Sequence, residues 1–377
     1  MIFACTQENL LQGLSLVGHI AGKSANLPIL ANVLMKVEEG TLKLSTTNLE
    51  MAVSVIVRGR VDQPGEYTVP AKLLQDYVSL LPAGKVEMSV TEEGLKISAD
   101  DKVTTIKGMP ASEFPLIPKL ARDGAYRFQA ELLKQAIGQV AFAVSSSESR
   151  PELSGVSCVF HGEERPDTLL MAATDSYRLS ERVVTMAQGG NTRSARCIVP
   201  ARALGEIGRI LSAYKDDVGV PEVVEWSITE SQLVFSYGNV ELVSRLIEGS
   251  FPDYRPLIPQ RFKSTFTVPR VELAKAIRAA SLFARQGIYD VLFEMKTPNG
   301  LSISSSDSGT GAHTTVLKGQ LEGDGNKVTL NFKYVSDGLA ALGTDQVTIR
   351  MIDAFSPVVL SSEKAEGFKY IVMPIRQ

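Results

Sequence analysis

Cysteine and histidine are scarce in this sequence, and their positions exclude the sites that these residues usually build. The three cysteines, Cys5, Cys158 and Cys197, are far apart and odd in number, so the sequence contains neither a disulfide framework nor the spacing of a zinc site. The three histidines, at positions 19, 161 and 313, occupy unrelated places in the chain. We therefore expect no metal site, and this cysteine usage is typical of a reducing compartment.

The sequence also lacks targeting segments and a strong charge of either sign. The first residues, MIFACTQENL, contain neither the basic region nor the apolar run of a signal peptide. No window approaches the ~20 apolar residues of a membrane-spanning helix. The formal net charge is −3, so the basic composition of many DNA-binding domains is absent, but net charge does not describe how charge is distributed. These features predict a cytoplasmic protein.

No motif of a catalytic site is present. The segment SDSGTG (306–311) lacks the lysine and the following helix of a phosphate-binding loop, and no GxGxxG follows a predicted strand. Asp175, Tyr177 and Arg178 are the best candidates for an enzyme site, but no base is found to face them. We therefore predict no catalytic residues and no cofactor.

One α/β unit occurs three times in the sequence. Its first recurring segment is a strand that runs into a helix, with Pro70, Pro200 and Asn331 at the expected helix start. Proline suits the first helical turn, and asparagine suits a cap. The three copies are EYTVPAKLLQDYVSLLP (66–82), RCIVPARALGEIGRILS (196–212) and KVTLNFKYVSDGLAALG (327–343).

Two further segments recur in the same order. A second helix is predicted at 7–21, 129–143 and 269–284, where Leu10, Leu132 and Leu273 begin the apolar stripe. A pair of strands bent about a polar corner is predicted at 41–57, 168–184 and 300–317. Asn48, Asp175 and Asp307 occupy the corner, and such residues favour turns because their side chains bond the local backbone.

Proline-rich segments, EFPLIP (113–118) and FPDYRPLIP (251–259), close the first two units, whereas the third ends in YIVMPIRQ (370–377), which we expect to be an exposed tail. The predicted domains are therefore 1–122, 123–260 and 261–377. Each should hold two helices packed on antiparallel sheet, which is an α+β fold. A threefold repeat without an active-site motif favours a binding or architectural protein over an enzyme.

Four segments in this order carry a resemblance to a known family: LPILANVLMKV (27–37), ATDSYRL (173–179), SFPDYRPLIP (250–259) and YIVMPIRQ. Over essentially the whole chain, the sequence resembles the bacterial DNA polymerase III β subunit, the sliding clamp. The resemblance implies a non-catalytic processivity factor, cytoplasmic and nucleoid-associated, in which two chains join head to tail into a ring with twelve inner helices. An interaction scaffold of repeats that does not close into a ring is the alternative.

The resemblance further implies partners: duplex DNA, bound topologically and without sequence specificity, and polymerase, clamp loader and repair proteins, which insert short linear peptides into a groove between the second and third domains. The matching groove residues are Leu153, Thr174, Ser176, Tyr177, Arg178, Leu179, Pro252, Pro256, Leu257, Phe355, Pro357, Ile371, Val372, Met373, Pro374, Ile375 and Arg376. Leu179, Leu257 and Met373 would form its floor. For Leu153, Leu179 and Val372, burial in a domain core is an equal alternative.

This sequence departs from the family pattern at three places. Ser176 and Tyr177 replace a Gly-His pair, Pro256 replaces a basic residue, and Gln377 replaces a terminal leucine. These departures concern which peptide sequences the groove would prefer, not its existence.

The ring also has an implied lining and an implied subunit contact. Twelve helices at ~9 Å separation would enclose a hole of ~34 Å, wider than a DNA duplex of roughly 20 Å. Leu282 and Phe283 lie where the family packs apolar residues between subunits. The basic residues expected to face DNA are Lys23, Lys72, Lys134, Arg202, Arg209, Lys275, Arg278 and Lys333.

Overall fold

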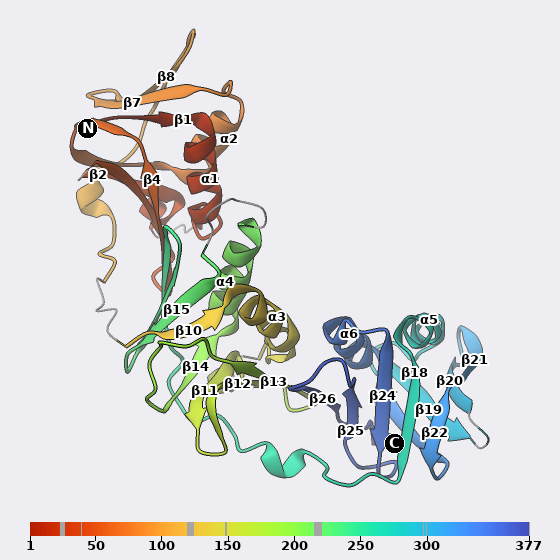
Figure 1. Ribbon diagram of the computed structural model, residues 1–377. Coiled ribbons are helices and arrows are strands. Elements are labelled where there is room, and N and C mark those ends of the chain that lie inside the picture. Colours follow the sequence, from red (N-terminus) through yellow and green to blue (C-terminus); the bar gives the residue numbers. More distant parts are fainter. Residues whose placement is uncertain are drawn as a thin grey trace. The chain divides into compact units, whose positions relative to one another are not determined.

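The structure is a computed structural model that describes residues 1–22, 27–38, 40–118, 124–147, 149–214, 221–296, 298 and 300–376. Lys23 and Gln377 lie outside the described residues. The chain divides into two compact units, whose elements are labelled in Figure 1. Unit 1 comprises Met1–Glu131, Ala187–Asn191 and Glu206–Leu246, and unit 2 comprises Leu132–Met186, Thr192–Gly205 and Ile247–Gln377.

Unit 1 contains two sheets, in which β17 of the second repeat pairs with β4 of the first. The five-stranded sheet has the order β5 (Arg60–Gln63), β1 (Ile2–Thr6), β7 (Lys85–Thr91), β8 (Gly94–Ala99), β9 (Lys102–Ile106). The eight-stranded sheet has the order β10 (Tyr126–Gln129), β15 (Val223–Ile228), β16 (Gln232–Tyr237), β17 (Val240–Arg245), β4 (Met51–Arg58), β3 (Thr41–Thr47), β2 (Asn32–Glu38), β6 (Gly65–Pro70).

Unit 2 also contains two sheets, and β13 of the second repeat pairs there with β26 of the third. The nine-stranded sheet has the order β14 (Ala195–Pro200), β11 (Gly155–Gly162), β12 (Arg165–Thr174), β13 (Arg178–Thr185), β26 (Phe368–Val372), β25 (Val358–Ser361), β24 (Gln346–Met351), β18 (Ser264–Pro269), β22 (Gln320–Gly323). The four-stranded sheet has the order β21 (Gly311–Lys318), β20 (Gly300–Asp307), β19 (Asp290–Lys296), β23 (Asn326–Asn331).

The helices confirm two per repeat, and every strand pairing in the described part of the chain is antiparallel. The α-helices are α1 (Gln7–Val17), α2 (Ala71–Ser79), α3 (Ala130–Val140), α4 (Ala201–Ala213), α5 (Arg270–Ser281) and α6 (Phe332–Leu342). Short 3-10 helices are η1 (Pro28–Ala31), η2 (Ala111–Glu113), η3 (Ala141–Ala143), η4 (Pro151–Leu153) and η5 (Arg255–Leu257). Among the described residues, no helix has both the length and the apolar character that crossing a membrane requires.

The predicted helix starts are confirmed, with one correction in detail. Asn331 caps α6, because its side chain accepts a hydrogen bond from the backbone N–H of Lys333 at 2.9 Å. Pro70 and Pro200 end strands, and the helices begin one residue later, so the prolines do not lie in the first helical turn as we expected. A proline at the end of a strand has no N–H to donate to the ladder, so it stops the strand as the helix begins.

The predicted start of the apolar stripe is wrong in α3. Leu132 is 41% exposed, whereas Leu133 is fully buried. Because α3 begins at Ala130, Leu133 stands three residues after the helix start, as Leu10 does in α1 and Leu273 does in α5. The correct equivalence therefore follows the helix start, which places the same turn of each helix against the core.

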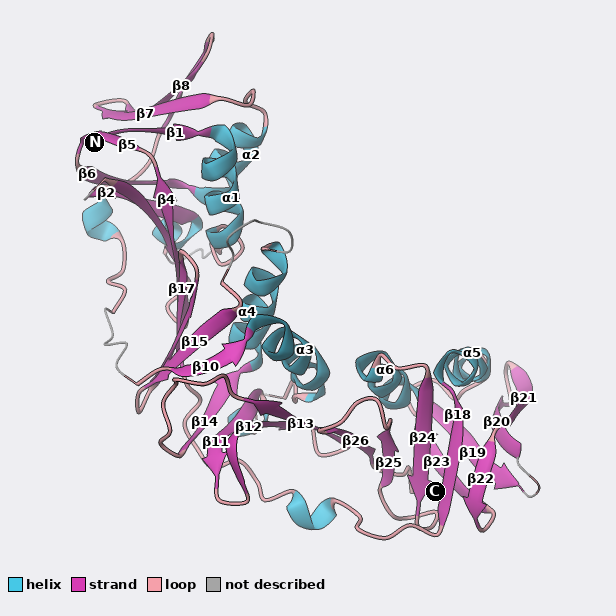
Figure 2. Cartoon of the chain, viewed as in Figure 1, coloured by secondary structure: helices cyan, strands magenta, loops and turns pink. Residues whose placement is uncertain are grey.

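The segment expected to be an exposed tail is instead largely a buried strand. β26 lies between β13 and β25, and Tyr370, Ile371 and Val372 are buried. Figure 2 shows α5 and α6 side by side over the sheets of the third repeat. A Cβ atom added at Gly338 of α6 would come within 2.3 Å of the Tyr370 ring, so α6 contacts β26 closely only because residue 338 is glycine.

Candidate functional site

The corner between β12 and β13 is built by local side-chain hydrogen bonds. The Asp175 carboxylate accepts hydrogen bonds from the backbone N–H groups of Tyr177 (2.9 Å) and Arg178 (3.0 Å). The Thr174 hydroxyl donates to the carbonyl of Arg178 at 2.6 Å and accepts from the N–H of Ser176 at 3.0 Å. The turn role predicted for Asp175 is therefore confirmed.

The corner of the first repeat has the same construction. The Asn48 side chain accepts hydrogen bonds from the N–H groups of Glu50 and Met51, and the Thr47 hydroxyl donates to the carbonyl of Met51. Leu49 has a φ of 74° and Ser176 a φ of 77°, so both corners require a left-handed residue at the same position. Glycine adopts this conformation without strain, which gives a physical reason for the glycine that Ser176 replaces in the resembled pattern.

Arg178 joins this corner to two other elements of unit 2. Its guanidinium contacts Asp175 at 3.0 Å and Asp337 of α6 at 2.5 Å, and it donates to the carbonyl of Phe142 at 2.9 Å. The charge also lies 4.8 Å from the centre of the Tyr334 ring. Three of its five N–H groups are thus occupied within the protein, and Arg178 holds the corner against α6 and η3 rather than standing free.

An apolar cavity of about 180 Å³ lies beside this corner. Its walls come from the corner of the second repeat, from the segment that follows β17, and from the end of β26 together with Met373. Its lining residues are Arg150, Thr174, Ser176, Arg178, Leu179, Pro252, Asp253, Tyr254, Leu257, Ile371 and Met373. We name this cavity the corner cleft.

The floor of the corner cleft is a small hydrophobic cluster. Leu179, Tyr254 and Ile371 are buried together with Ala172 and Val359. The Tyr254 hydroxyl donates to the carboxylate of Glu181 at 2.9 Å. Burial and then the neighbouring Glu181 charge raise the pKa of Tyr254, so its hydroxyl stays protonated and can donate this hydrogen bond.

The predicted groove residues divide among four environments. Eight of them line the corner cleft: Thr174, Ser176, Arg178, Leu179, Pro252, Leu257, Ile371 and Met373. Leu153 and Val372 are buried in the core and do not line the corner cleft, which favours the core alternative for both. Leu179 is buried and also lines the corner cleft. The exposed Tyr177 stacks on Tyr334 at 6.5 Å between ring centres. Pro256 and Arg376 are exposed, and Pro357 and Pro374 are half-buried.

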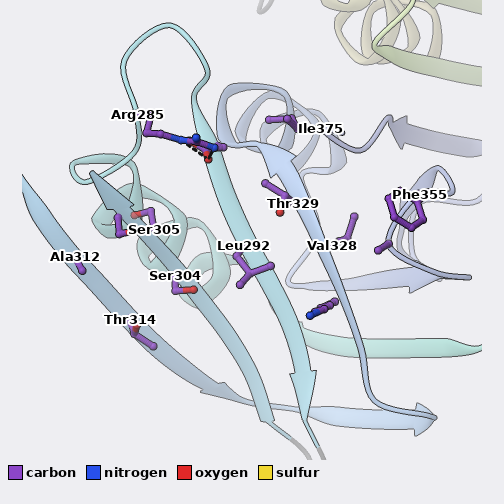
Figure 3. Close-up of a pocket in the computed structure, with 14 residues that line it drawn as sticks. Arg285, Leu292, Ser304, Ser305, Ala312, Thr314, Val328, Thr329, Phe355 and Ile375 are labelled. Carbon is purple, nitrogen blue, oxygen red and sulfur yellow. Dashed lines mark hydrogen bonds and ion pairs between the residues drawn. The ribbon is translucent and has the colours of Figure 1, made fainter. Parts of the chain in front are cut away.

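Phe355 and Ile375 line a second, more open cavity of about 760 Å³. Figure 3 shows Phe355 on one side of it and Ala312 and Thr314 on the other. The chain after Met373 is fixed there, since the N–H of Ile375 donates to the carbonyl of Thr329 at 2.9 Å. The segment 373–375 therefore runs from the corner cleft to this second cavity.

Sequence reasoning missed three residues of the corner cleft. Asp253 and Tyr254 stand within the FPDYR segment that carried the resemblance, so their position was the available signal. Arg150 pairs with Glu152 at 2.9 Å and keeps an exposed side chain. Its side chain is open to solvent, whereas the guanidinium of Arg178 is largely enclosed by the protein.

The basic residues predicted to face DNA are placed on helices in most cases. Lys72, Arg202, Lys275, Arg278 and Lys333 are exposed on α2, α4, α5 and α6, and Lys134 on α3 is half-buried.

Arg209 has a structural role instead. Its guanidinium pairs with the buried carboxylate of Glu206 and donates to the carbonyls of Ser15 and Leu16 near the end of α1. Because these contacts stabilise the helix end, Arg209 is not a free basic side chain.

The predicted subunit-contact residues lie beside an unpaired sheet edge. Leu282 is the C-cap residue that follows α5, and it is 72% exposed. Phe283 is half-buried and stacks on His313 of β21 at 5.7 Å between ring centres. β21 is the terminal strand of the four-stranded sheet, so one row of its backbone N–H and C=O groups has no partner strand among the described residues. Leu282 lies beside this edge, and Val316 of β21 is exposed as well.

An equivalent edge exists in unit 1, which sequence reasoning missed. β9 is the terminal strand of the five-stranded sheet, and its Val103 is exposed. Leu80 is the C-cap residue that follows α2 and is 74% exposed, and the ammonium of Lys102 on β9 donates to its carbonyl at 3.2 Å. Each of the two edges thus carries an exposed valine and lies beside an exposed leucine at a helix end.

The three histidines lie in separate environments. The Nδ1 atom of His19 lies 2.8 Å from Glu206, the Nδ1 atom of His161 accepts from the N–H of Asp167, and the Nε2 atom of His313 contacts the hydroxyl of Thr315. Within the described residues, no group of three histidine, cysteine, aspartate or glutamate side chains is placed to hold a metal ion.

Comparison with known proteins identifies the class of protein that carries this fold. The models of the N-terminal, central and C-terminal domains of the DNA polymerase III beta subunit match residues 1–118, 127–253 and 255–376. A beta sliding clamp of Synechocystis sp. is 29% identical over 403 residues, covering 100% of this chain and 99% of the relative. One of Staphylococcus aureus is 29% identical over 362 residues, covering 93% of this chain and 92% of the relative.

Solved structures with a similar fold are also sliding clamps. The DNA polymerase sliding clamp of Bacillus subtilis has a TM-score of 0.92 at 28% identity and covers 100% of this chain and 99% of its own. A Pseudomonas aeruginosa sliding clamp bound to griselimycin has a TM-score of 0.92 at 26% identity, with 100% of both chains covered. The chain belongs to the DNA polymerase III beta subunit family, the sliding clamps, which are non-catalytic processivity factors of DNA polymerase III. The predicted family and the predicted absence of enzymatic activity are therefore confirmed.

Proposed function

We propose that two copies of this chain join head to tail into a ring that encircles duplex DNA and slides along it. The ring tethers DNA polymerase, the clamp loader and repair proteins through short peptides that bind in the corner cleft. The observation that carries this proposal is the cleft itself, in a family whose members are polymerase processivity factors.

The chemistry of the corner cleft fits an apolar linear peptide. Leu179, Leu257 and Met373 offer an apolar surface, and methionine adapts its shape to different side chains. Arg150 and Asp253 provide charged groups at the lining for the ends or polar side chains of the peptide. Grooves of this kind bind by burying a few apolar anchors, with polar contacts fixing the direction.

The two sheet edges support ring closure. β9 and β21 each have one unpaired side, and pairing between them across two copies would hide both edges. A contact between two different surfaces closes into a ring when the rotation allows it. The exposed leucines Leu80 and Leu282 would then be buried in the same contact. Counting the α-helices in the described part of each chain, such a dimer has twelve, two from each of six repeats.

The exposed basic residues on α2, α4, α5 and α6 support weak attraction of DNA to a lining of helices. Since phosphate contacts carry no sequence information, the ring would slide without reading the bases. The formal net charge of the whole chain is −3, so this attraction would be local to the basic side chains. We further propose the domain division 1–122, 123–260 and 261–377 and a cytoplasmic, nucleoid-associated location.

Peptide binding tests the cleft. The double variant Leu179→Ala with Met373→Ala removes two apolar contacts, so affinity for a polymerase-derived peptide should fall by about 100-fold or more. Fluorescence polarisation with a labelled peptide measures this, and gel filtration checks that the oligomeric state is unchanged. Leu132→Ala, at an exposed position on α3, is the matched control and should bind normally. Unchanged affinity of the double variant would refute the cleft assignment.

A further inference from the structure

Two cysteines that are distant in the sequence lie opposite each other in the nine-stranded sheet. The register of the antiparallel strands β11 and β14 pairs Cys158 with Cys197, and both are free thiols. Residues directly opposite in such a ladder have Cα atoms about 4.5–5.5 Å apart and side chains on the same face. A disulfide requires about 4.4–6.8 Å, so the two sulfurs can bond without moving the strands apart.

The two thiols differ in accessibility. Cys158 is fully buried, whereas Cys197 is half-buried on β14, which is the terminal strand of its sheet. A hydrogen bond to Cys197 and then burial raise the pKa of the Cys158 thiol well above its ordinary value. Cys197 is therefore the sulfur that a reagent can reach, and Cys158 is held beside it as a protonated thiol.

The third cysteine has no such neighbour. Cys5 lies opposite Val86 in the five-stranded sheet, and burial raises the pKa of its thiol to about 12. It therefore serves as an internal reference for a buried cysteine without a partner.

We propose that Cys158 and Cys197 are a redox modification site. The two cysteines form a reversible intrachain disulfide with each other, by exchange with a low-molecular-weight disulfide such as glutathione disulfide. The Cys197 thiolate attacks one sulfur of the reagent, the S–S bond breaks, and one glutathione leaves as a thiolate. Cys158 then loses its proton to that thiolate or to water and attacks the sulfur of Cys197. This step releases the second glutathione, so two protein thiols are oxidised and one reagent disulfide is reduced to two thiols.

The disulfide would fix an edge strand that is otherwise paired on one side only. β14 pairs with β11 and ends at Pro200, directly before α4. The covalent loop between the two cysteines also contains the β12–β13 corner that lines the corner cleft. Terminal strands are among the parts of a sheet that open most easily, so the bond would stabilise the strand that carries Cys197.

The test is oxidation of the reduced, folded chain with glutathione disulfide, followed by alkylation in denaturant and mass spectrometry. The expected product has lost two hydrogens, carries an alkyl group only on Cys5, and yields a linked peptide that contains Cys158 and Cys197. Dithiothreitol should restore three alkylated cysteines. A chain that keeps three alkylated cysteines, a stable glutathione adduct, or a link between two chains would overturn the proposal.

Single variants test the order of attack. Cys158→Ser should accumulate a glutathione adduct on Cys197, because the resolving thiol is gone. Cys197→Ser should remain unmodified, because Cys158 is inaccessible, and Cys5→Ser should form the intrachain bond at the normal rate. An adduct on Cys158 in the Cys197→Ser variant, with a folded circular dichroism spectrum, would contradict the assigned roles.

Discussion

At the residue scale, Ser176 has a backbone conformation that favours glycine, although its side chain carries a Cβ atom. The corner needs a left-handed residue, and Ser176 supplies it with a φ of 77°. A residue with a Cβ atom is strained there by about 1–2 kcal/mol relative to glycine. The two side-chain turns of Thr174 and Asp175 hold the conformation in place despite that strain.

Ser176→Gly should therefore raise the free energy of unfolding by about 0.5–1 kcal/mol, since relief of the strain exceeds the added flexibility of the unfolded chain. Urea unfolding followed by circular dichroism measures the change. Ser336→Gly is the control, because Ser336 is exposed within α6 and relieves no left-handed strain. The control should lower stability, and a Ser176→Gly variant that is also less stable would contradict this reading of the corner.

At the element scale, the helix starts and turns of the repeat could be predicted where one side chain bonds the local backbone. Asn331 marks a cap and Asp175 marks a turn, because their side chains bond neighbouring backbone groups. The pairing of β17 with β4 and of β13 with β26 could not be predicted, since ladders between repeats leave no short-range pattern in the sequence. The cleft residues Asp253 and Tyr254 were missed although the segment around them was recognised, because only tertiary packing beside Leu179 and Ile371 shows that they line the cleft.

The proposed pairing of the β9 and β21 edges predicts how the chain assembles. Gel filtration of the unmodified chain should give a dimer of about twice 40.8 kDa. A lysine placed in either edge, by Val103→Lys on β9 or Val316→Lys on β21, should give monomers, because a charge would be buried in the contact. Val271→Lys, at an exposed valine in the first turn of α5, is the control and should leave the dimer intact.

Mixing the two edge variants distinguishes pairing of unlike edges from pairing of like edges. If β9 of one copy meets β21 of the other, a mixed pair retains one unaltered contact and should partly recover dimers in analytical ultracentrifugation. Dimers that persist in both single variants, or a mixture that stays wholly monomeric, would contradict pairing between β9 and β21.

At the scale of the whole molecule, binding by encirclement differs from binding by contact. Ionic contacts with phosphate weaken steeply with salt, whereas a closed ring on circular DNA has no path of escape. After loading on nicked circular DNA, the protein should remain bound at about 1 M salt and dissociate when a restriction enzyme linearises the DNA. Gel filtration of the DNA complex measures retention, and proteins bound at both DNA ends should restore it. Retention on open linear DNA would indicate ordinary binding.

The place of β26 between β13 and β25 has a consequence for synthesis. β13 ends at Thr185, but its neighbour begins at Phe368, about 180 residues later. At a translation rate of about 5–20 residues per second, β13 waits roughly 10 to 40 s with one edge uncovered. During that interval the nascent chain presents a bare strand and half of a cleft, so a partner can recognise only a chain whose synthesis has passed β26.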